Sequence, residues 1–291
     1  MPNSRTVPSV IENYIRSSVN CPVALIGCRA SGKSHDCCEY DLALFTEESR
    51  QSEVLDIGGH AVELLYFSKQ PRSYAVELQE MAIMRDDNRL SLASAAKGMT
   101  LQAGHKALVA AGRKSLVGSL FYQQKMTDAA ENPAIAGMWA QFAAYQFLGG
   151  MLELSGARPM PLHELEQVRQ ADTSAGLADG IQAALECIGT ERATRPAISR
   201  SIEATMELKS KDHDRDLVLS KVNHLLERQM LSDCYFYIGR MASENLARRS
   251  DSFYARYAKL IQLSMDLTND VQELKKLQRR LFRAANAGLK V

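Results

Sequence analysis

The short spacing between a glycine-rich loop and the strand predicted after it limits the folds open to this chain. Residues 27–34 read GCRASGKS and match the phosphate-binding pattern G-x-x-x-x-G-K-[ST] letter for letter. In a P-loop the lysine and the serine open a helix whose first amides face the phosphates. Only residues 34–39 separate Lys33 from the next strand-like run at Tyr40, too few for a crossover helix of about 10 residues. This spacing argues against a P-loop NTPase or kinase, which is kept only as an alternative.

A second pattern overlaps the first, with acidic and apolar residues alternating where the strand begins. Residues i and i+2 of a strand point to the same face, so Glu39 and Asp41 are expected side by side while Tyr40 and Leu42 face the core. Two carboxylates at this distance repel each other unless a cation lies between them. The pattern therefore predicts a site for Mg²⁺ or Mn²⁺, with the loop amides binding phosphate.

The motif resembles the nucleotidyltransferase superfamily of the polymerase-β type, and within it the minimal and aminoglycoside-type enzymes. Their pattern runs Gly-Ser-x-Ala-Arg-Gly and then Ser-Asp-x-Asp; the positions in register here are Gly27, Cys28, Ala30, Gly32, Cys38, Glu39 and Asp41. Cys28 and Cys38 stand where the family has serine, and Ser31 stands where it has arginine. Since a thiol is a weak hydrogen-bond donor, these changes weaken the expected hold on phosphate more than the metal site.

The resemblance implies a Mg²⁺-dependent (or Mn²⁺-dependent) enzyme that moves a nucleoside monophosphate from an NTP to a hydroxyl of a small molecule or a protein and releases pyrophosphate. It implies that Glu39 and Asp41 are metal ligands. The nucleotide is expected to contact Gly27, Cys28, Gly32, Lys33 and Ser34. The altered phosphate loop also motivates a second hypothesis, a degenerate nucleotidyltransferase fold that serves as a binding or regulatory module.

These enzymes carry a third carboxylate on a neighbouring strand. Glu63 lies within the apolar run AVELLYFS, where burying a charge without a partner would be costly. We therefore expect Glu63 to be the third catalytic metal ligand. Asp56, one strand earlier, is the competing candidate.

The sequence pattern of the N-terminal third is typical of a small mixed α/β domain. Gly58 and Gly59 are expected to form a hairpin turn. The predicted elements are a helix at 10–18, strands at 23–27, 40–45, 54–57 and 61–68, a helix from about Ser73 to Asp86, and a short edge strand in GMTLQAG, 98–104.

Beyond Gly104 apolar residues recur three and four apart, which predicts a helical bundle. Residues 257–291 are expected to form one long terminal helix, while PAISR (196–200) and KSKDHDRD (209–216) are expected to be loops. The aromatic residues of the first bundle segment are expected in the core: Trp139, Phe142, Tyr145 and Phe147. The predicted fold class is α+β, with a nucleotidyltransferase-like domain at 1–106 and an all-α domain at 107–291 that binds an acceptor or a partner.

The composition limits the classes of partner that we expect for this chain. Lys+Arg number 35 and Asp+Glu 34, so the net charge of +1 argues against nucleic acid or a membrane as the main partner. The expected partners are an NTP and a hydroxyl acceptor, with a homodimer as an open alternative. The chain has no apolar stretch of membrane-spanning length and is expected to be cytoplasmic, with reduced cysteines.

Overall fold

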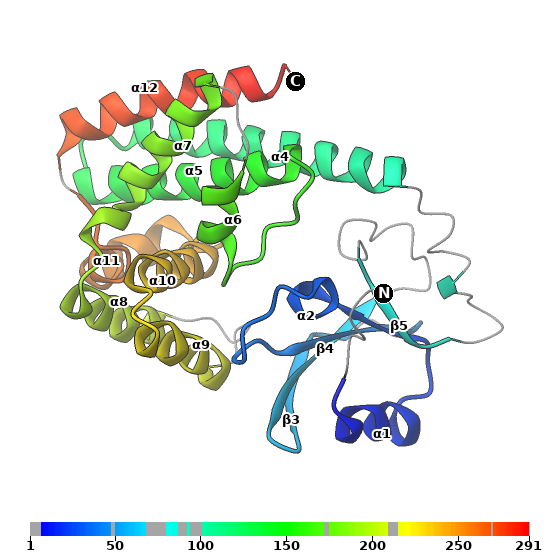
Figure 1. Ribbon diagram of the computed structural model, residues 1–291. Coiled ribbons are helices and arrows are strands. Elements are labelled where there is room, and N and C mark those ends of the chain that lie inside the picture. The colour runs from blue at the N-terminus through cyan, green and yellow to red at the C-terminus, as the bar shows by residue number, and fades with distance from the viewer. Residues whose placement is uncertain are drawn as a thin grey trace. The chain divides into compact units, whose positions relative to one another are not determined.

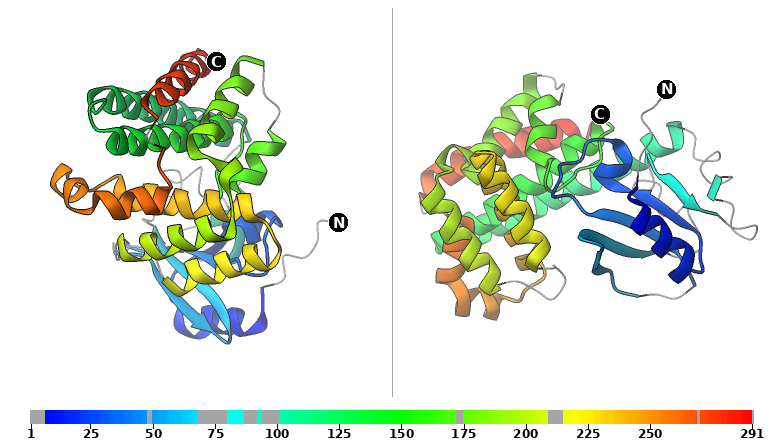
Figure 2. Two further views of the ribbon diagram at one scale, coloured as in Figure 1. Left: turned by 90° about the vertical axis from the view of Figure 1, so that its left-hand side faces the viewer. Right: turned by 60° about the horizontal axis from the view of Figure 1, so that its bottom comes forward.

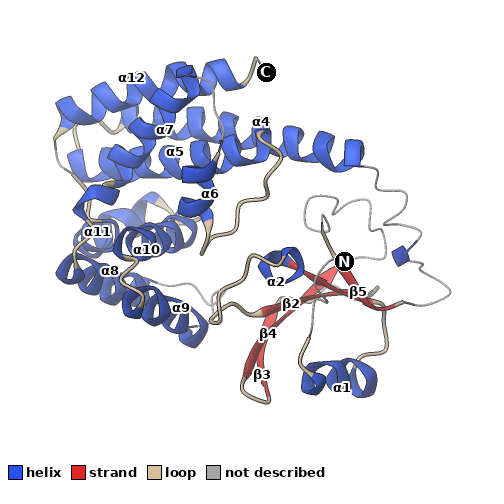
Figure 3. Ribbon diagram, viewed as in Figure 1, coloured by secondary structure: helices blue, strands red, loops and turns tan. Residues whose placement is uncertain are grey.

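The computed structural model describes residues 7–47, 50–67, 80–86, 92–93, 101–171, 175–208, 215–268 and 270–290. The chain divides into two compact units, Met1–Ala107 and Leu108–Val291. The first contains a mixed sheet, and the second is built of helices (Figures 1 and 3). The chain is therefore an α+β unit followed by a helical unit, as the sequence predicts.

The sheet of the first unit has five strands in the order β3-β4-β2-β1-β5. The strands are β1 (Val23–Ile26), β2 (Tyr40–Phe45), β3 (Glu53–Ile57), β4 (His60–Phe67) and β5 (Ala82–Arg85). The central strands β2 and β4 run parallel, while the other neighbouring pairs run antiparallel. Gly58 and Gly59 both have positive φ and form the predicted β3–β4 turn.

The two faces of the sheet differ in what covers them. Helix α1 (Ser9–Ser18) buries Ile11 and Ile15 against one face, and Leu42 belongs to the same cluster (Figure 2). Ala43 and Phe45 belong to a separate cluster with Leu92. Because side chains alternate along a strand, the odd-numbered positions of β2 face away from α1.

Two expected elements near the end of this unit are wrong. Residues 82–85, expected in a helix, form β5, in which Ala82 and Met84 pack on the core while Ile83 is 39% exposed. Pairing with β1 overrides the helical spacing of the local sequence. Residues 101–104, expected in an edge strand, begin helix α4 (Leu101–Asp128). Residues 80, 81 and 86, also expected in the helix, are not helical, and the remaining parts of both predictions, 73–79 and 98–100, lie outside the described residues.

The second unit is organised around helix α5 (Pro133–Leu154), whose residues from Ala136 to Leu152 are buried apart from Gln146. A helix that is apolar on all sides must lie inside a bundle. Trp139, Phe142, Tyr145 and Phe147 are core residues, as predicted. The surrounding elements are α6 (Glu164–Gln170), α7 (Ala175–Ile188), η2 (Thr190–Arg192), α8 (Arg195–Leu208), α9 (Arg215–Glu227), α10 (Leu231–Leu246), α11 (Asp251–Met265) and α12 (Val271–Gly288).

Two boundaries in this unit differ from expectation. PAISR is helical and opens α8, since Pro196 lies in the first turn, where proline is tolerated. The predicted terminal helix is two helices, because Asp266 ends α11 in the left-handed conformation and the Asp270 side chain caps α12. Of KSKDHDRD, 209–214 lie outside the described residues, and Arg215 and Asp216 belong to α9.

Across the described ranges, no helix is both long enough and apolar enough to cross a bilayer.

Candidate functional site

Three carboxylates converge at one end of the central parallel strands. Glu39 immediately precedes β2, Asp41 lies on β2, and Glu63 lies opposite Asp41 in the register of β4. One oxygen from each carboxylate lies within 4.8 Å of the others, and all three residues are half-buried. Glu39 and Asp41 lie on the same face because they are two residues apart. Glu63 joins them because the parallel register places it beside Asp41.

Asp56, the competing candidate, does not join this group. It is exposed, and its Oδ1 accepts a hydrogen bond of 2.9 Å from the Gly59 backbone N–H in the β3–β4 turn. Val54, and not Asp56, pairs with Glu63 in the β3–β4 register. Asp56 therefore stabilises the turn of the β3–β4 hairpin.

The glycine-rich loop begins directly beside Asp41. Ile26 at the end of β1 pairs with Asp41, and Gly27 follows with φ +75°. A methyl group built on Gly27 would overlap Asp41 Oδ2. Both the backbone conformation and the close approach therefore require glycine at this position.

The loop continues as a short helix, α2 (Gly27–Ser31), which ends at Gly32 with φ +74°. The Lys33 N–H donates to the Cys28 carbonyl at 2.9 Å, and the Lys33 and Ser34 side chains are exposed beyond the helix. In a P-loop this pair would open the helix instead. Strands β1 and β2 are also antiparallel, which excludes the parallel βαβ unit of that fold. The P-loop alternative is therefore wrong.

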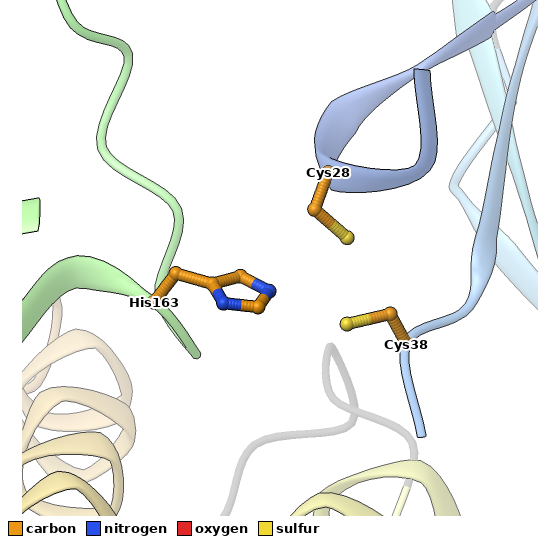
Figure 4. A group of neighbouring side chains, drawn as sticks. All are labelled: Cys28, Cys38 and His163. Atoms are coloured by element: carbon orange, nitrogen blue, oxygen red, sulfur yellow. The ribbon is translucent and has the colours of Figure 1, made fainter. Parts of the chain in front are cut away.

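Cys28 and Cys38 place two buried thiols beside the acids. Their sulfur atoms lie within 4.8 Å of each other and are turned toward one another (Figure 4). Hydrogen bonding to Cys38 and burial raise the pKa of the Cys28 thiol far above its ordinary value. The side chain of Cys28 is thus directed to a second thiol of the loop, and the two cysteines do not form a disulfide bond.

Arg29 holds the loop in place, a role that the sequence did not indicate. Its Nε donates to the Cys38 carbonyl at 2.8 Å, and its Nη2 donates to the Asp36 carbonyl at 3.1 Å. The guanidinium also lies 4.0 Å from the centre of the Tyr40 ring. These contacts fix the backbone that leads into Glu39. No sequence signal identifies them, because the carbonyls meet Arg29 only once the loop has folded.

Comparison with known proteins finds similarity in structure but not in sequence. No model of a protein family matches the chain, and no curated protein matches it. Among solved structures it is similar to the crystal structure of a nucleotidyltransferase-like protein from Exiguobacterium sibiricum 255-15. The two share 14% sequence identity over 89% of this chain and 88% of the other, with a TM-score of 0.37, so their backbones agree only in part.

Proposed function

We propose that this chain is a divalent-metal-dependent nucleotidyltransferase that transfers a nucleoside monophosphate from an NTP to a hydroxyl group. The observation that carries the proposal is the convergence of Glu39, Asp41 and Glu63 next to the Gly27 loop. Acids held together on adjacent strands beside a glycine-rich turn supply both halves of a metal-triphosphate site.

The donor set fits a hard divalent cation. Carboxylate oxygens are the ligands that Mg²⁺ and Mn²⁺ prefer. One oxygen of each carboxylate lies within 4.8 Å of the others, so Glu39, Asp41 and Glu63 would hold such a cation after moving inward. When bound, the cation would neutralise charge on the phosphates and lower the pKa of the attacking hydroxyl.

The residues of the chain would orient the nucleotide. The backbone at Gly27 approaches Asp41 without an intervening side chain, so the loop amides would be available to bind the phosphates. Lys33 is exposed just beyond α2 and would contact the triphosphate as a flexible point charge. Arg29 would act through the loop, by keeping residues 36–38 fixed.

A labelling experiment tests the transfer. The protein is incubated with each α-labelled NTP, Mg²⁺ or Mn²⁺, and a cell extract as the source of acceptors; labelled product and released pyrophosphate are measured. We expect both to be lost in Glu39→Gln, Asp41→Asn and Glu63→Gln. Asp56→Asn, a neighbouring acid outside the group, is the matched control and should retain activity. Transfer from γ-labelled but not α-labelled NTP would overturn the proposal.

A binding or regulatory role is the second candidate, and the Cys28–Cys38 contact favours it. A thiol engaged with another thiol is a poor substitute for a hydroxyl that donates to phosphate. Calorimetry with Mg²⁺–NTP and Mn²⁺–NTP separates the outcomes. Binding without pyrophosphate release would identify a nucleotide-binding module, and absence of binding to every NTP would exclude both nucleotide roles.

A further inference from the structure

A pocket in the helical unit, remote in sequence from the acids, has no role in the proposed transfer. It holds about 570 Å³ and opens between α11 and the turn that joins α4 to α5. This volume is in the range of small-molecule sites. Its walls combine charged residues from two helices with aromatic and alanine side chains.

The aromatic wall is rigid. Trp139 is 5% exposed and stacks on Tyr122, with ring centres 5.6 Å apart and an angle of 11° between the planes. Tyr254, which also lines the pocket, meets the indole edge-on at 5.4 Å. Ala258, on α11, adds an apolar side chain to the lining. A wall fixed by such contacts orders few side chains when a ligand binds.

The charges of the pocket have an excess of one negative. Lys125 Nζ lies 4.6 Å from the centre of the Trp139 ring, so the chain's own ammonium already uses this aromatic surface. Asp128 accepts a hydrogen bond from Gln124. Asp251 lies in the first turn of α11, and among the described residues no cation pairs with it. The pocket lining therefore contains two exposed carboxylates and one ammonium.

We propose that this pocket binds a small organic cation, an ammonium group carried on a flat apolar body. The ammonium would lie at Asp251 and Asp128, and the body would rest against Trp139 and Ala258. The Asp251 carboxylate would favour a ligand with a positive charge, and the aromatic and alanine side chains would favour a ligand with an apolar body. The inference is independent of the transfer proposed above, because it uses none of those residues.

Trp139 makes the proposal directly measurable, since it is the only tryptophan in the chain. Fluorescence excited beyond the tyrosine absorption band therefore comes from Trp139 alone, which lines this pocket. The probe is 2-phenylethylammonium, titrated into the full-length protein without nucleotide. We expect a saturable change in emission with a Kd on the order of millimolar, typical of a ligand of this size.

Two variants and two further probes complete the test. Asp251→Asn and Asp128→Asn should each weaken binding about threefold to fivefold, as expected for a partly exposed ion pair. Asp216→Asn removes an exposed acid from the first turn of α9 and is the matched control, with unchanged binding. Phenylalanine, which adds a carboxylate, and 3-phenylpropionate, which has only the carboxylate, should bind more weakly in that order.

Three results would overturn the inference: no saturable change with the ammonium probe, tighter binding of 3-phenylpropionate, or unchanged binding in both pocket variants. Circular dichroism of each variant verifies that the helices are intact. Should one pocket variant fail to fold, the other and the probe series still decide the outcome.

Discussion

The Cα of Gly27 lies so near the Asp41 carboxylate that no side chain fits between them. Gly27 and Gly32 both have positive φ, but only Gly27 has a neighbour within reach of a methyl group. A substitution at Gly32 would therefore introduce backbone strain alone, whereas the same substitution at Gly27 would also push against the Asp41 carboxylate.

We expect Gly27→Ala to weaken Mn²⁺ binding at least tenfold, because the methyl group must displace Asp41. Gly32→Ala should lower the free energy of unfolding by about 1 kcal/mol through strain alone and leave Mn²⁺ binding intact. Calorimetric titration with Mn²⁺ and urea unfolding measure the two effects. Equal loss of Mn²⁺ affinity in both variants would mean that the Asp41 contact is unimportant.

Three carboxylates within 4.8 Å repel one another when no cation is bound. Asp41→Asn removes part of this repulsion, so the metal-free variant should unfold at a higher temperature than the unchanged protein. It should also lose the stabilisation that Mg²⁺ gives by binding the folded state. Thermal unfolding with and without Mg²⁺ tests both expectations, and Glu12→Gln, a partly exposed acid on α1 that pairs with Arg16, serves as the control.

The thiols beside the acids should differ in reactivity from their neighbour in the sequence. Cys28 and Cys38 are buried, whereas Cys37 is partly exposed. Iodoacetamide should therefore modify Cys37 well before the other two under native conditions, and at equal rates in denaturant. Mass spectrometry of peptides after timed quenching measures the order. Early modification of Cys28 would show that the loop opens readily.

Glu164 introduces a pH dependence into the helical unit. Its carboxylate is fully buried, and Arg240 Nε lies 3.5 Å away. Burial raises the pKa of Glu164 from 4.5 to about 7, against the opposing charge of Arg240. Between these values the folded protein keeps a proton that the unfolded chain releases, so stability falls as pH rises.

The loss should total roughly 3 kcal/mol between about pH 4.5 and pH 7, and it should be absent in Glu164→Gln, which has no proton to lose. Urea unfolding across this range, followed by tryptophan fluorescence, gives the measurement. Parallel curves for the two proteins would assign the pH dependence to other groups.

Local patterns predicted much of the first unit. The alternation around Leu42 located β2, and the short interval before Tyr40 argued against the P-loop, which the antiparallel β1–β2 pair excludes. The apolar run around Glu63 favoured it over Asp56, but only the register of β4 against β2, a pairing between separate segments, shows that Glu63 lies opposite Asp41. The same reason accounts for β5, whose helical spacing is overridden by its pairing with β1.

In the helical unit, periodicity located the helices but not all of their ends. Asp266 and Asp270 break what reads as one amphipathic segment, through a left-handed residue and a side-chain cap. The Trp139 pocket was also missed, since an aromatic residue at helical spacing reads as core, and Trp139 is both core and wall.

The parallel pairing of β2 with β4 also bears on how the protein matures. The β3–β4 hairpin closes through two adjacent glycines and is local, whereas β4 must pair with β2 across the intervening β3. Contacts between distant segments tend to form late, because the chain loses loop entropy before they are rewarded. The three acids thus come together only after the centre of the sheet has assembled. A cation that requires all three carboxylates would therefore bind only after β2 and β4 have paired.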